Sequence, residues 1–451
     1  MKMKKVLKGL ALGAVISLAV ASGAQAGLKE VNMFGASAQY DFWSAAGPAY
    51  LGAQGCAAGD IVSLKKKGQT IAPFDKRDYF IAVCKGDTPA AGQTVGGGIG
   101  ANHDTVVIRY TTYASGQGVK AVMDDDTDVD ECTASGAGYR GMIDTLNAAG
   151  TSISTVGCKQ VHGGASDVAA ETFDFDSHGA SEGPCSADWR DEEVRGLTAN
   201  PEFNNLLPAF KPLVVPFAFF ANAQFPFDNI SRSQAFLVFT GAVDNWNFFK
   251  ADLNGDGQIT ADAYPAGDDL PVRVCMRHAS SGTQATLLAS IIRREGAIDG
   301  YENPFFAPYK YFNKGSTEMV NCIKGCDATG YADFGGAIGI IDADKEVPVA
   351  TSMTEDGTLS PDGKMKRLSY NGFTAIEPNI KNGNYDFWSA QHLYQHKDDS
   401  QDAKDLVASL VAFASDPANL DTHMSGKAPF WAAQDEMLVT KDNDFAMPAK
   451  K

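Results

Sequence analysis

One stretch of the chain reads Arg277-His278-Ala279-Ser280-Ser281-Gly282-Thr283 and runs directly into a helical pattern over residues 284–294. It places small hydroxyl residues and a glycine where a strand ends and a helix begins. Small residues let the backbone come close to a ligand, and amides at a helix N-terminus bind anions together with Ser and Thr hydroxyls. Arg277 adds a planar guanidinium that can hold two oxygens of one oxyanion. The stretch therefore predicts an oxyanion site made of amides, hydroxyls and one arginine.

Three other segments have the same character, each at the end of an expected strand. They read Phe34-Gly35-Ala36-Ser37-Ala38, Tyr113-Ala114-Ser115-Gly116-Gln117-Gly118 and Gly163-Gly164-Ala165-Ser166-Asp167. Any one of them alone is common in proteins, and a Ser-Gly-Thr helix start is often only an N-cap. Their combination and their order favour one shared site.

The charge balance restricts how such a site can work. The chain has 38 Lys and Arg against 55 Asp and Glu, a formal net charge of −17 at pH 7. A field of this sign repels nucleic acid and anionic lipid, so neither is an expected partner. A small anion must therefore be bound by local hydrogen bonds rather than by the overall charge.

The composition is that of a globular protein, with 451 residues, 44% of them hydrophobic and 21% charged, a length that suits two or three domains. Strand patterns occur at residues 105–110, 213–220 and 336–341, and helical patterns at 231–240, 284–294 and 402–414. This alternation predicts an α/β fold with ligands at the carboxyl ends of the strands. Polar surface insertions are expected at 56–103 and 171–200, and a linker at 345–367.

The N-terminal region has the pattern of a signal peptide over residues 1–26. Lys2, Lys4 and Lys5 precede an apolar stretch at 6–20, and Ala24-Gln25-Ala26 has the form of a cleavage site. An uncleaved membrane anchor is the alternative. No later stretch reaches 18 consecutive apolar residues, so no direct membrane anchor is expected. The pattern predicts export to the periplasm, or secretion to the medium or cell surface.

Eight cysteines fit an exported protein with disulfide bonds. They are Cys56, Cys84, Cys132, Cys158, Cys185, Cys275, Cys322 and Cys326. Local closures are expected first, as Cys56–Cys84 and Cys322–Cys326, while the remaining connectivity stays open. Metal ligation is disfavoured, because a structural zinc site needs paired ligands and only one close pair exists.

Residues 252–260 resemble the start of a calcium-binding loop. The candidate ligands are Asp252, Asn254, Asp256 and Gln258, with Gly257 at the position of the sharp turn. The loop lacks the final acidic ligand, since Ala263 stands there and Asp262 comes one residue early. A structural calcium ion and an Asp/Asn/Gly-rich turn are the two alternatives. No other cofactor is expected.

The ordered set of segments resembles the substrate-binding proteins of phosphate ABC transporters, a branch of the type II periplasmic binding proteins. The resemblance rests on Gly35-Ala36-Ser37, the Tyr113 and Gly164 segments, the Pro-bearing apolar strand at 215–222, the Phe239 to Trp246 segment, Arg277 with Ser281-Gly282-Thr283, the 336–341 strand and Asn382-Gly383-Asn384-Tyr385. It spans most of the chain, and Arg-x3-Ser-Gly-Thr is its most specific element. The chain is long for the family, with the additional length in the cysteine-bearing segments.

The resemblance implies a two-lobed α/β fold with hinge strands and disulfide-bearing surface insertions. Lobe I would comprise residues 27–215 and 346–451, and lobe II residues 216–345. Phosphate would lie in the interlobe cleft, and the closed, monomeric protein would deliver it to a membrane ABC permease. By position, the implied phosphate-binding residues are Ala36, Ser37, Ser115, Asp167, Arg277, Ser281, Gly282 and Thr283.

Asp167 is unusual in this set, because a carboxylate faces an anion. An ionised carboxylate only accepts hydrogen bonds, so it favours an oxyanion that keeps a proton and penalises one that has none. This predicts a preference for phosphate over sulfate. Arsenate carries the same proton and nearly the same shape, so it should bind as well.

Two other classes of function remain open. A phosphate-ester hydrolase would use Ser281 or Ser166 as nucleophile and His162 or His278 as base. The sequence lacks a two-metal cluster of carboxylates and histidines, which disfavours catalysis of phosphate-ester hydrolysis. A secreted scaffold that keeps the fold and binds a partner through its insertions is the third reading.

Overall fold

The computed structural model describes most of the chain after the first 26 residues. The described ranges are 27–85, 104–123, 138–174, 196–225, 227–249, 270–292, 310–313, 315–325, 335–345, 359–360, 362–423 and 430–451, with the short pieces 132, 135–136, 177–179 and 192–194. The expected signal peptide and the expected calcium loop both lie outside these residues. Among the helices described, none is long and apolar enough to cross a membrane.

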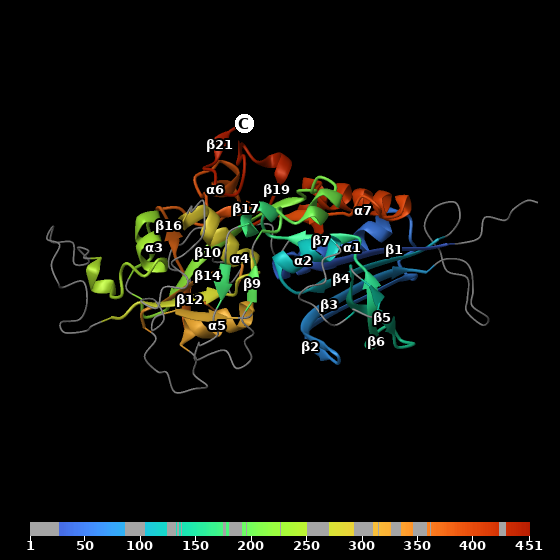
Figure 1. The fold of residues 1–451 in the computed structure, drawn as a ribbon, viewed down its shortest axis with the longest axis horizontal. Coiled ribbons are helices and arrows are strands. Elements are labelled where there is room, and N and C mark those ends of the chain that lie inside the picture. The colour runs from blue at the N-terminus through green and yellow to red at the C-terminus, as the bar shows by residue number, and fades with distance from the viewer. Residues whose placement is uncertain are drawn as a thin grey trace, which may run out of the picture.

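Two sheets form the two halves of the molecule (Figure 1). The first sheet has the strand order β18-β7-β1-β4-β3-β2. Its strands are β1 (Leu28–Gly35), β2 (Ile61–Ile71), β3 (Phe74–Cys84), β4 (Thr105–Thr112), β7 (Gly163–Ser166) and β18 (His392–Tyr394). β1 runs parallel to both β4 and β7, so the carboxyl ends of these three strands lie at one edge.

Helices pack on the first sheet, and this packing buries their apolar faces. They are α1 (Tyr40–Ala53), α2 (Ser115–Val122) and α7 (Gln401–Ala414), and α8 (Pro417–His423) packs on α1 and α7. α1 packs on β3 and β4, while α2 packs on β7 and β1. α7 begins within one residue of the position that its sequence pattern predicts, with the Ser400 side chain accepting from the Ala403 N–H as an N-cap.

The second sheet has the order β13-β12-β14-β10-β15. The strands in this order are β10 (Leu213–Asn222), β12 (Arg273–Arg277), β13 (Lys310–Asn313), β14 (Ala337–Asp342) and β15 (Met365–Arg367), and the short strands β17 (Trp388–Ala390) and β19 (Ala432–Ala433) also pair with β10. The helices of this half are α3 (Arg232–Phe239), α4 (Gly282–Leu287) and α5 (Ser316–Lys324). β10 is buried along its whole length, which explains its continuous apolar sequence. β12 runs parallel to β13 and β14, so these strands also end at a common edge.

Shorter elements complete the described fold. They are β5 (Tyr139–Leu146), β6 (Ile153–Gln160), β8 (Ser177–Gly179), β9 (Glu192–Val194), β11 (Asn229–Ile230), β16 (Ser369–Tyr370), β17 (Trp388–Ala390), β19 (Ala432–Ala433), β20 (Val439–Thr440), β21 (Ala449–Lys450) and α6 (Glu377–Lys381). The β5–β6 hairpin packs on β3 and β4 of the first sheet.

The return of the chain to the first sheet occurs between β17 and β18. β17 pairs with β10, whereas β18 begins two residues later and pairs with β7. The sequence suggested residue 346 for this boundary. However, β15 pairs with β10 and β16 pairs with β11, so residues 365–370 belong with the second half. Composition marks an irregular stretch but does not reveal which strand the following residues will pair with.

The prediction of a surface insertion at 56–103 is wrong for residues 61–84. Residues 61–84 form the β2–β3 hairpin, which completes the edge of the first sheet. The three strand patterns and the helix at 231–240 are confirmed as β4, β10, β14 and α3. The polar residues of β2 face solvent on an edge strand, so their polarity concealed a regular strand.

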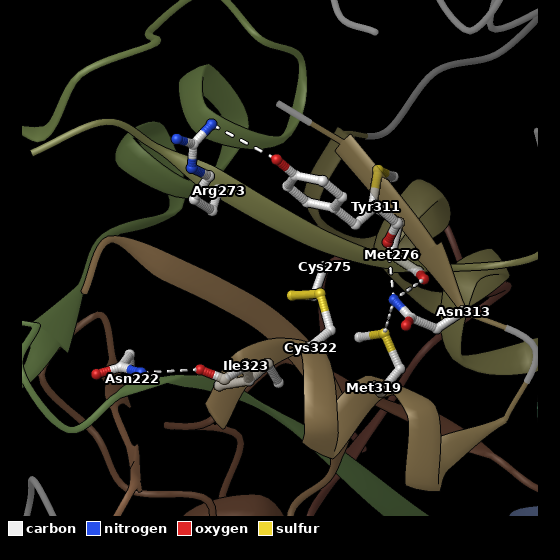
Figure 2. Close-up of a disulfide and its surroundings, with 9 residues drawn as sticks. All are labelled: Asn222, Arg273, Cys275, Met276, Tyr311, Asn313, Met319, Cys322 and Ile323. Atoms are coloured by element: carbon white, nitrogen blue, oxygen red, sulfur yellow. Dashed lines mark hydrogen bonds between the residues drawn. A yellow bond between two sulfur atoms is a disulfide. The ribbon is translucent and has the colours of Figure 1, made fainter. Parts of the chain in front are cut away.

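Six of the cysteines form three disulfides in the described residues, Cys56–Cys84, Cys132–Cys158 and Cys275–Cys322. The first confirms the sequence prediction. The expected Cys322–Cys326 bridge is wrong, because Cys322 on α5 bonds to Cys275 on β12 (Figure 2). Forty-seven residues separate this pair, and only the packing of α5 against the second sheet brings them together. Cys326 lies outside the described residues.

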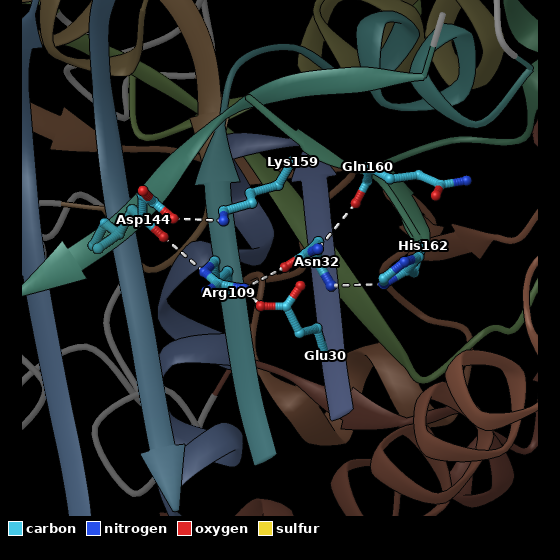
Figure 3. Close-up of polar contacts among 8 residues, drawn as sticks. Glu30, Asn32, Arg109, Asp144, Lys159, Gln160 and His162 are labelled. Atoms are coloured by element: carbon cyan, nitrogen blue, oxygen red, sulfur yellow. Dashed lines mark hydrogen bonds and ion pairs between the residues drawn. The ribbon is translucent and has the colours of Figure 1, made fainter. Parts of the chain in front are cut away.

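A buried polar cluster fixes the β5–β6 hairpin to the middle of β1 and β4 (Figure 3). Arg109 donates from Nε to the Ile143 carbonyl at 2.6 Å and from Nη1 to Glu30 Oε1 at 2.8 Å and Asn32 Oδ1 at 2.9 Å. A guanidinium shared among three acceptors is satisfied where water is excluded. The cluster therefore holds the β5–β6 hairpin, β1 and β4 together.

Candidate anion-binding site

The four small-residue segments lie at the carboxyl ends of four strands. The first and second lie at the ends of β1 and β4, the third comprises β7 itself with Asp167 after it, and the fourth begins with Arg277, the last residue of β12. The first segment is bonded to the third, because the Ala36 N–H donates to the Ala165 carbonyl at 2.9 Å. Gly35 has φ +134°, and a Cβ there would lie 2.1 Å from the same carbonyl, so the turn requires glycine. Ser37 is half-buried and begins a short 3-10 helix.

Ser115 and Asp167 form a reciprocal pair. The Ser115 hydroxyl donates to Asp167 Oδ2 at 3.0 Å, and the Asp167 N–H donates back to Ser115 Oγ at 3.2 Å. Both residues are buried, and the Ser389 hydroxyl donates to the Asp167 carbonyl. Within the described residues, Asp167 Oδ1 makes no hydrogen bond of normal geometry. A buried carboxylate oxygen is thus left available as an acceptor.

The fourth segment lies at the end of β12 and the start of α4. Arg277 is 3% exposed, and its Nη1 lies 3.4 Å from the Ser316 hydroxyl at the first turn of α5. Ser281 occupies the N-cap position of α4, with Gly282 and Thr283 in its first turn, and all three are buried. The Ser281 side chain makes no capping bond, so its hydroxyl is not committed to the helix.

The two halves of the site touch each other. The Gly116 N–H of the second segment donates to the Ser280 carbonyl of the fourth at 3.1 Å. A Cβ added at Gly282 would lie 2.3 Å from Ser115 Oγ and 2.6 Å from Asp167 Oδ2. The fourth segment therefore packs directly on the Ser115–Asp167 pair, and only glycine leaves room for this approach.

The environment of Asp167 disfavours its charged form. Burial and, after it, the nearby charge of Asp342 raise the pKa of Asp167 to about 7, although Ser115, Arg277 and Gln391 act in the opposite direction. This carboxyl therefore changes its protonation state close to neutral pH. It can accept a hydrogen bond when ionised and donate one when protonated.

Four residues around this pair were not foreseen from the sequence. They are Ser316, Asp342, Ser389 and Gln391. Gln391 is fully buried, and in the described part of the chain neither its amide oxygen nor its nitrogen has a hydrogen bond of normal geometry. Polar side chains that follow the buried aromatic pair Phe387-Trp388 were the available signal, but nothing local indicates that they approach residues more than 200 positions away.

The residues proposed for a hydrolase have other contacts. Ser166 donates from its hydroxyl to the Val168 carbonyl at 2.7 Å, and His162 Nδ1 accepts from the Asn32 N–H at 3.4 Å. Burial lowers the pKa of His162. The ring of His278 lies 3.2 Å from the Ser280 hydroxyl. These contacts do not assemble a nucleophile and a base.

Metal binding has no support in the described part of the chain, where no group of three or more His, Cys, Asp or Glu side chains is placed to hold an ion. The calcium candidates Asp252, Asn254, Asp256 and Gln258 lie outside the described residues. The structure therefore leaves that prediction as it stood.

Comparison with known proteins places this geometry in a family. The solved structures that the chain matches include a phosphate-binding protein from Stenotrophomonas maltophilia, with 14% identity over 90% of this chain and 92% of that chain at a TM-score of 0.44. Another is an ABC-type phosphate transport receptor from Vibrio cholerae, with 16% identity over 49% of this chain and 72% of that chain at a TM-score of 0.33. A family model described as the PBP superfamily domain matches residues 192–417, which is 226 of the 451 residues. The chain belongs to the PBP superfamily and has its mixed α/β, two-lobed type II architecture.

Proposed function

We propose that this protein is a phosphate receptor that holds the anion between its two lobes and delivers it to an ABC-type permease, without catalysing a reaction. The observation that supports this most is the meeting of the four segments. Gly282 of the second half packs on the Ser115–Asp167 pair of the first half, and Arg277 lies beside them. Amides, hydroxyls and a guanidinium in one buried place are the donors that an oxyanion needs.

The proposed binding uses groups from both halves. Arg277 supplies the charge-assisted bonds, while Ser281, Gly282 and Thr283 supply amides and hydroxyls at the start of α4. Ala36, Ser37 and Ser115 supply donors from the first half. Because the donors belong to different sheets, a bound anion links the two halves and favours the closed arrangement.

Asp167 would select the ligand by its proton. Its Oδ1 is buried without a hydrogen bond of normal geometry in the described chain, and the buried Gln391 amide close to the carboxyl lowers its pKa but also makes no bond of that geometry. Unpaired buried polar groups are costly, so a ligand that satisfies them is favoured. Phosphate can donate to the ionised carboxylate, and arsenate can do the same, whereas sulfate cannot.

The site is tested by removing the arginine. Arg277→Ala should weaken phosphate binding by about a hundredfold or more, since a buried charge-assisted donor is lost. Arg232→Ala removes the same charge from α3 in the second half, and should leave the affinity unchanged. Equilibrium dialysis with radiolabelled phosphate measures both. Equal affinities of wild type and Arg277→Ala would refute the proposed site, and turnover of a chromogenic phosphate ester would refute a purely binding role.

Export belongs to the same proposal. The signal-peptide pattern and the three disulfides suit an oxidising compartment, so we place the protein in the periplasm or at the cell surface as a monomer. Mass spectrometry of the exported protein should find a chain that starts at Gly27. A chain that still carries residues 1–26 would favour the membrane-anchor alternative.

A further inference from the structure

The carboxyl edge of the second sheet carries a carboxylate that the phosphate proposal does not use. In the strand register, Arg277 at the end of β12 lies opposite Asn313 of β13, and Cys275 lies opposite Gly339 of β14. Continuing this register by two residues places Arg277 beside Ile341, the residue before Asp342, which is the last residue of β14. Asp342 therefore lies at the same edge as the arginine, next to the site and half-buried.

Strand β10 connects this carboxylate to the Asp167 loop. Asp342 lies opposite Phe217 of β10, and the Ala343 N–H donates to the Pro216 carbonyl at 3.0 Å. Two positions earlier, Val215 lies opposite Ser389, whose hydroxyl donates to the Asp167 carbonyl. The backbone thus fixes Asp342 and Asp167 on either side of the junction between the two sheets.

We propose that Asp342 is a second specificity-determining carboxylate, which controls whether Asp167 carries a proton and hence at which pH the site accepts an oxyanion that has none. This inference rests on the proposed phosphate function. The reason is electrostatic, because two neighbouring carboxylates are not both ionised without a cost. The charge of Asp342 is the second largest contribution to the raised pKa of Asp167, after burial.

The other charged and titratable groups around Asp167 do not replace Asp342 in this role. Arg277 on β12 lowers the pKa of Asp167. Tyr110 on β4 is fully buried, and its pKa is raised well above the ordinary value, so it stays neutral. Asp444 accepts from the Ala169 N–H at 2.7 Å, and burial lowers the pKa of His392 to about 4, so that ring is neutral in the working range.

Sulfate is a direct probe of this proton, because it carries none of its own near neutral pH. When Asp167 is protonated, it can donate to a sulfate oxygen. When Asp167 is ionised, its carboxylate repels the sulfate dianion, and sulfate has no proton with which to donate a hydrogen bond to it. Sulfate affinity should therefore be constant below the pKa of Asp167 and should fall tenfold for each pH unit above it.

The experiment measures sulfate affinity by calorimetry from about pH 5 to about pH 9. The wild type should show a break near pH 7, where Asp167 titrates. Asp342→Asn should move the break to lower pH by about one unit, because one negative neighbour is gone. Asp344→Asn removes the same charge two residues away and should leave the break in place. Asp167→Asn should abolish the break, since an amide donates at every pH.

A second measurement needs no ligand. Carbon-13 NMR of aspartate-labelled protein, with the Asp167 signal assigned from its loss in Asp167→Asn, should show a lower pKa for this carboxyl in Asp342→Asn. An unchanged pKa and an unchanged sulfate break would overturn the inference. Circular dichroism checks that each variant is folded, and absence of phosphate binding by the wild type at pH 8 would instead refute the proposed function.

Discussion

Asp167 shows how one side chain can be unfavourable for folding and still suit binding. It is buried beside Ser115, and its Oδ1 has no hydrogen bond of normal geometry among the described residues. Burial and the charge of Asp342 raise its pKa to about 7 from a model-compound value of 3.8. The folded protein therefore binds the proton of the Asp167 carboxyl more tightly than the unfolded chain does. In the ionised form, Asp167 Oδ1 would accept a hydrogen bond from a protonated ligand.

This pKa has a consequence for stability. An acid with a raised folded-state pKa contributes most below its unfolded value, and the contribution is lost as pH rises to the folded value. The loss for Asp167 spans about pH 4 to about pH 7 and amounts to about 4 kcal/mol. Asp167→Asn should therefore become more stable relative to wild type as pH rises through this window. Urea unfolding of both proteins in phosphate-free buffer measures the difference, and a difference that does not change with pH would contradict the burial argument.

At the residue scale the sequence predicted part of the site. Ser115, Asp167, Gly282 and Arg277 could be singled out because each stands in a short local pattern after a strand. Gln391, Ser389 and Asp342 could not, because their relation to Asp167 depends on the crossing between the two halves. Residue type alone gives such side chains no distinguishing signal.

At the element scale, α4 begins against the first half of the molecule rather than in open space. Its first residue, Gly282, packs on Ser115 and Asp167, which explains why a helix predicted from residue 284 begins earlier, at 282. Hydrophobic periodicity reports the buried face of a helix. It does not report a first turn made of small, buried residues.

Gly282→Ala tests this contact. The added methyl group would lie 2.3 Å from Ser115 Oγ and 2.5 Å from Asp167 Cβ, so the halves must separate or the pair must shift. We expect phosphate affinity to fall by about tenfold or more, with little change in the circular dichroism of the helices. Gly52→Ala in α1 is the control, since its nearest contact would be Ile61 Cδ1 at 3.8 Å. Equal affinity in the two variants would show that the close approach is not needed for binding.

Long-range pairing also decided which elements were missed. The β2–β3 hairpin has many polar residues because β2 is an edge strand, and the sequence therefore suggested an irregular insertion. The Cys275–Cys322 bridge joins β12 to α5, the two elements that carry Arg277 and Ser316. Local spacing favoured Cys326, but the packing of a helix on a sheet determined the partner.

At the scale of the whole molecule, two sheets meet at one buried polar site while the chain as a whole is strongly acidic. The net charge of −17 repels an approaching phosphate, and salt screens this repulsion. The association rate constant for phosphate should therefore rise, by a few-fold, as sodium chloride increases from about 0.01 M to about 0.15 M. Stopped-flow fluorescence checks this, and a rate that falls with salt would mean that a local positive field guides the ligand.

The central claim is that the four segments form one phosphate site between the lobes. Calorimetric titration of residues 27–451, first unfolded and refolded to remove bound anion, tests it most directly. At pH 8 we predict one phosphate per chain with a dissociation constant below about 1 μM, and far weaker binding of sulfate. No heat with phosphate, or equal affinity for the two anions, would contradict the account.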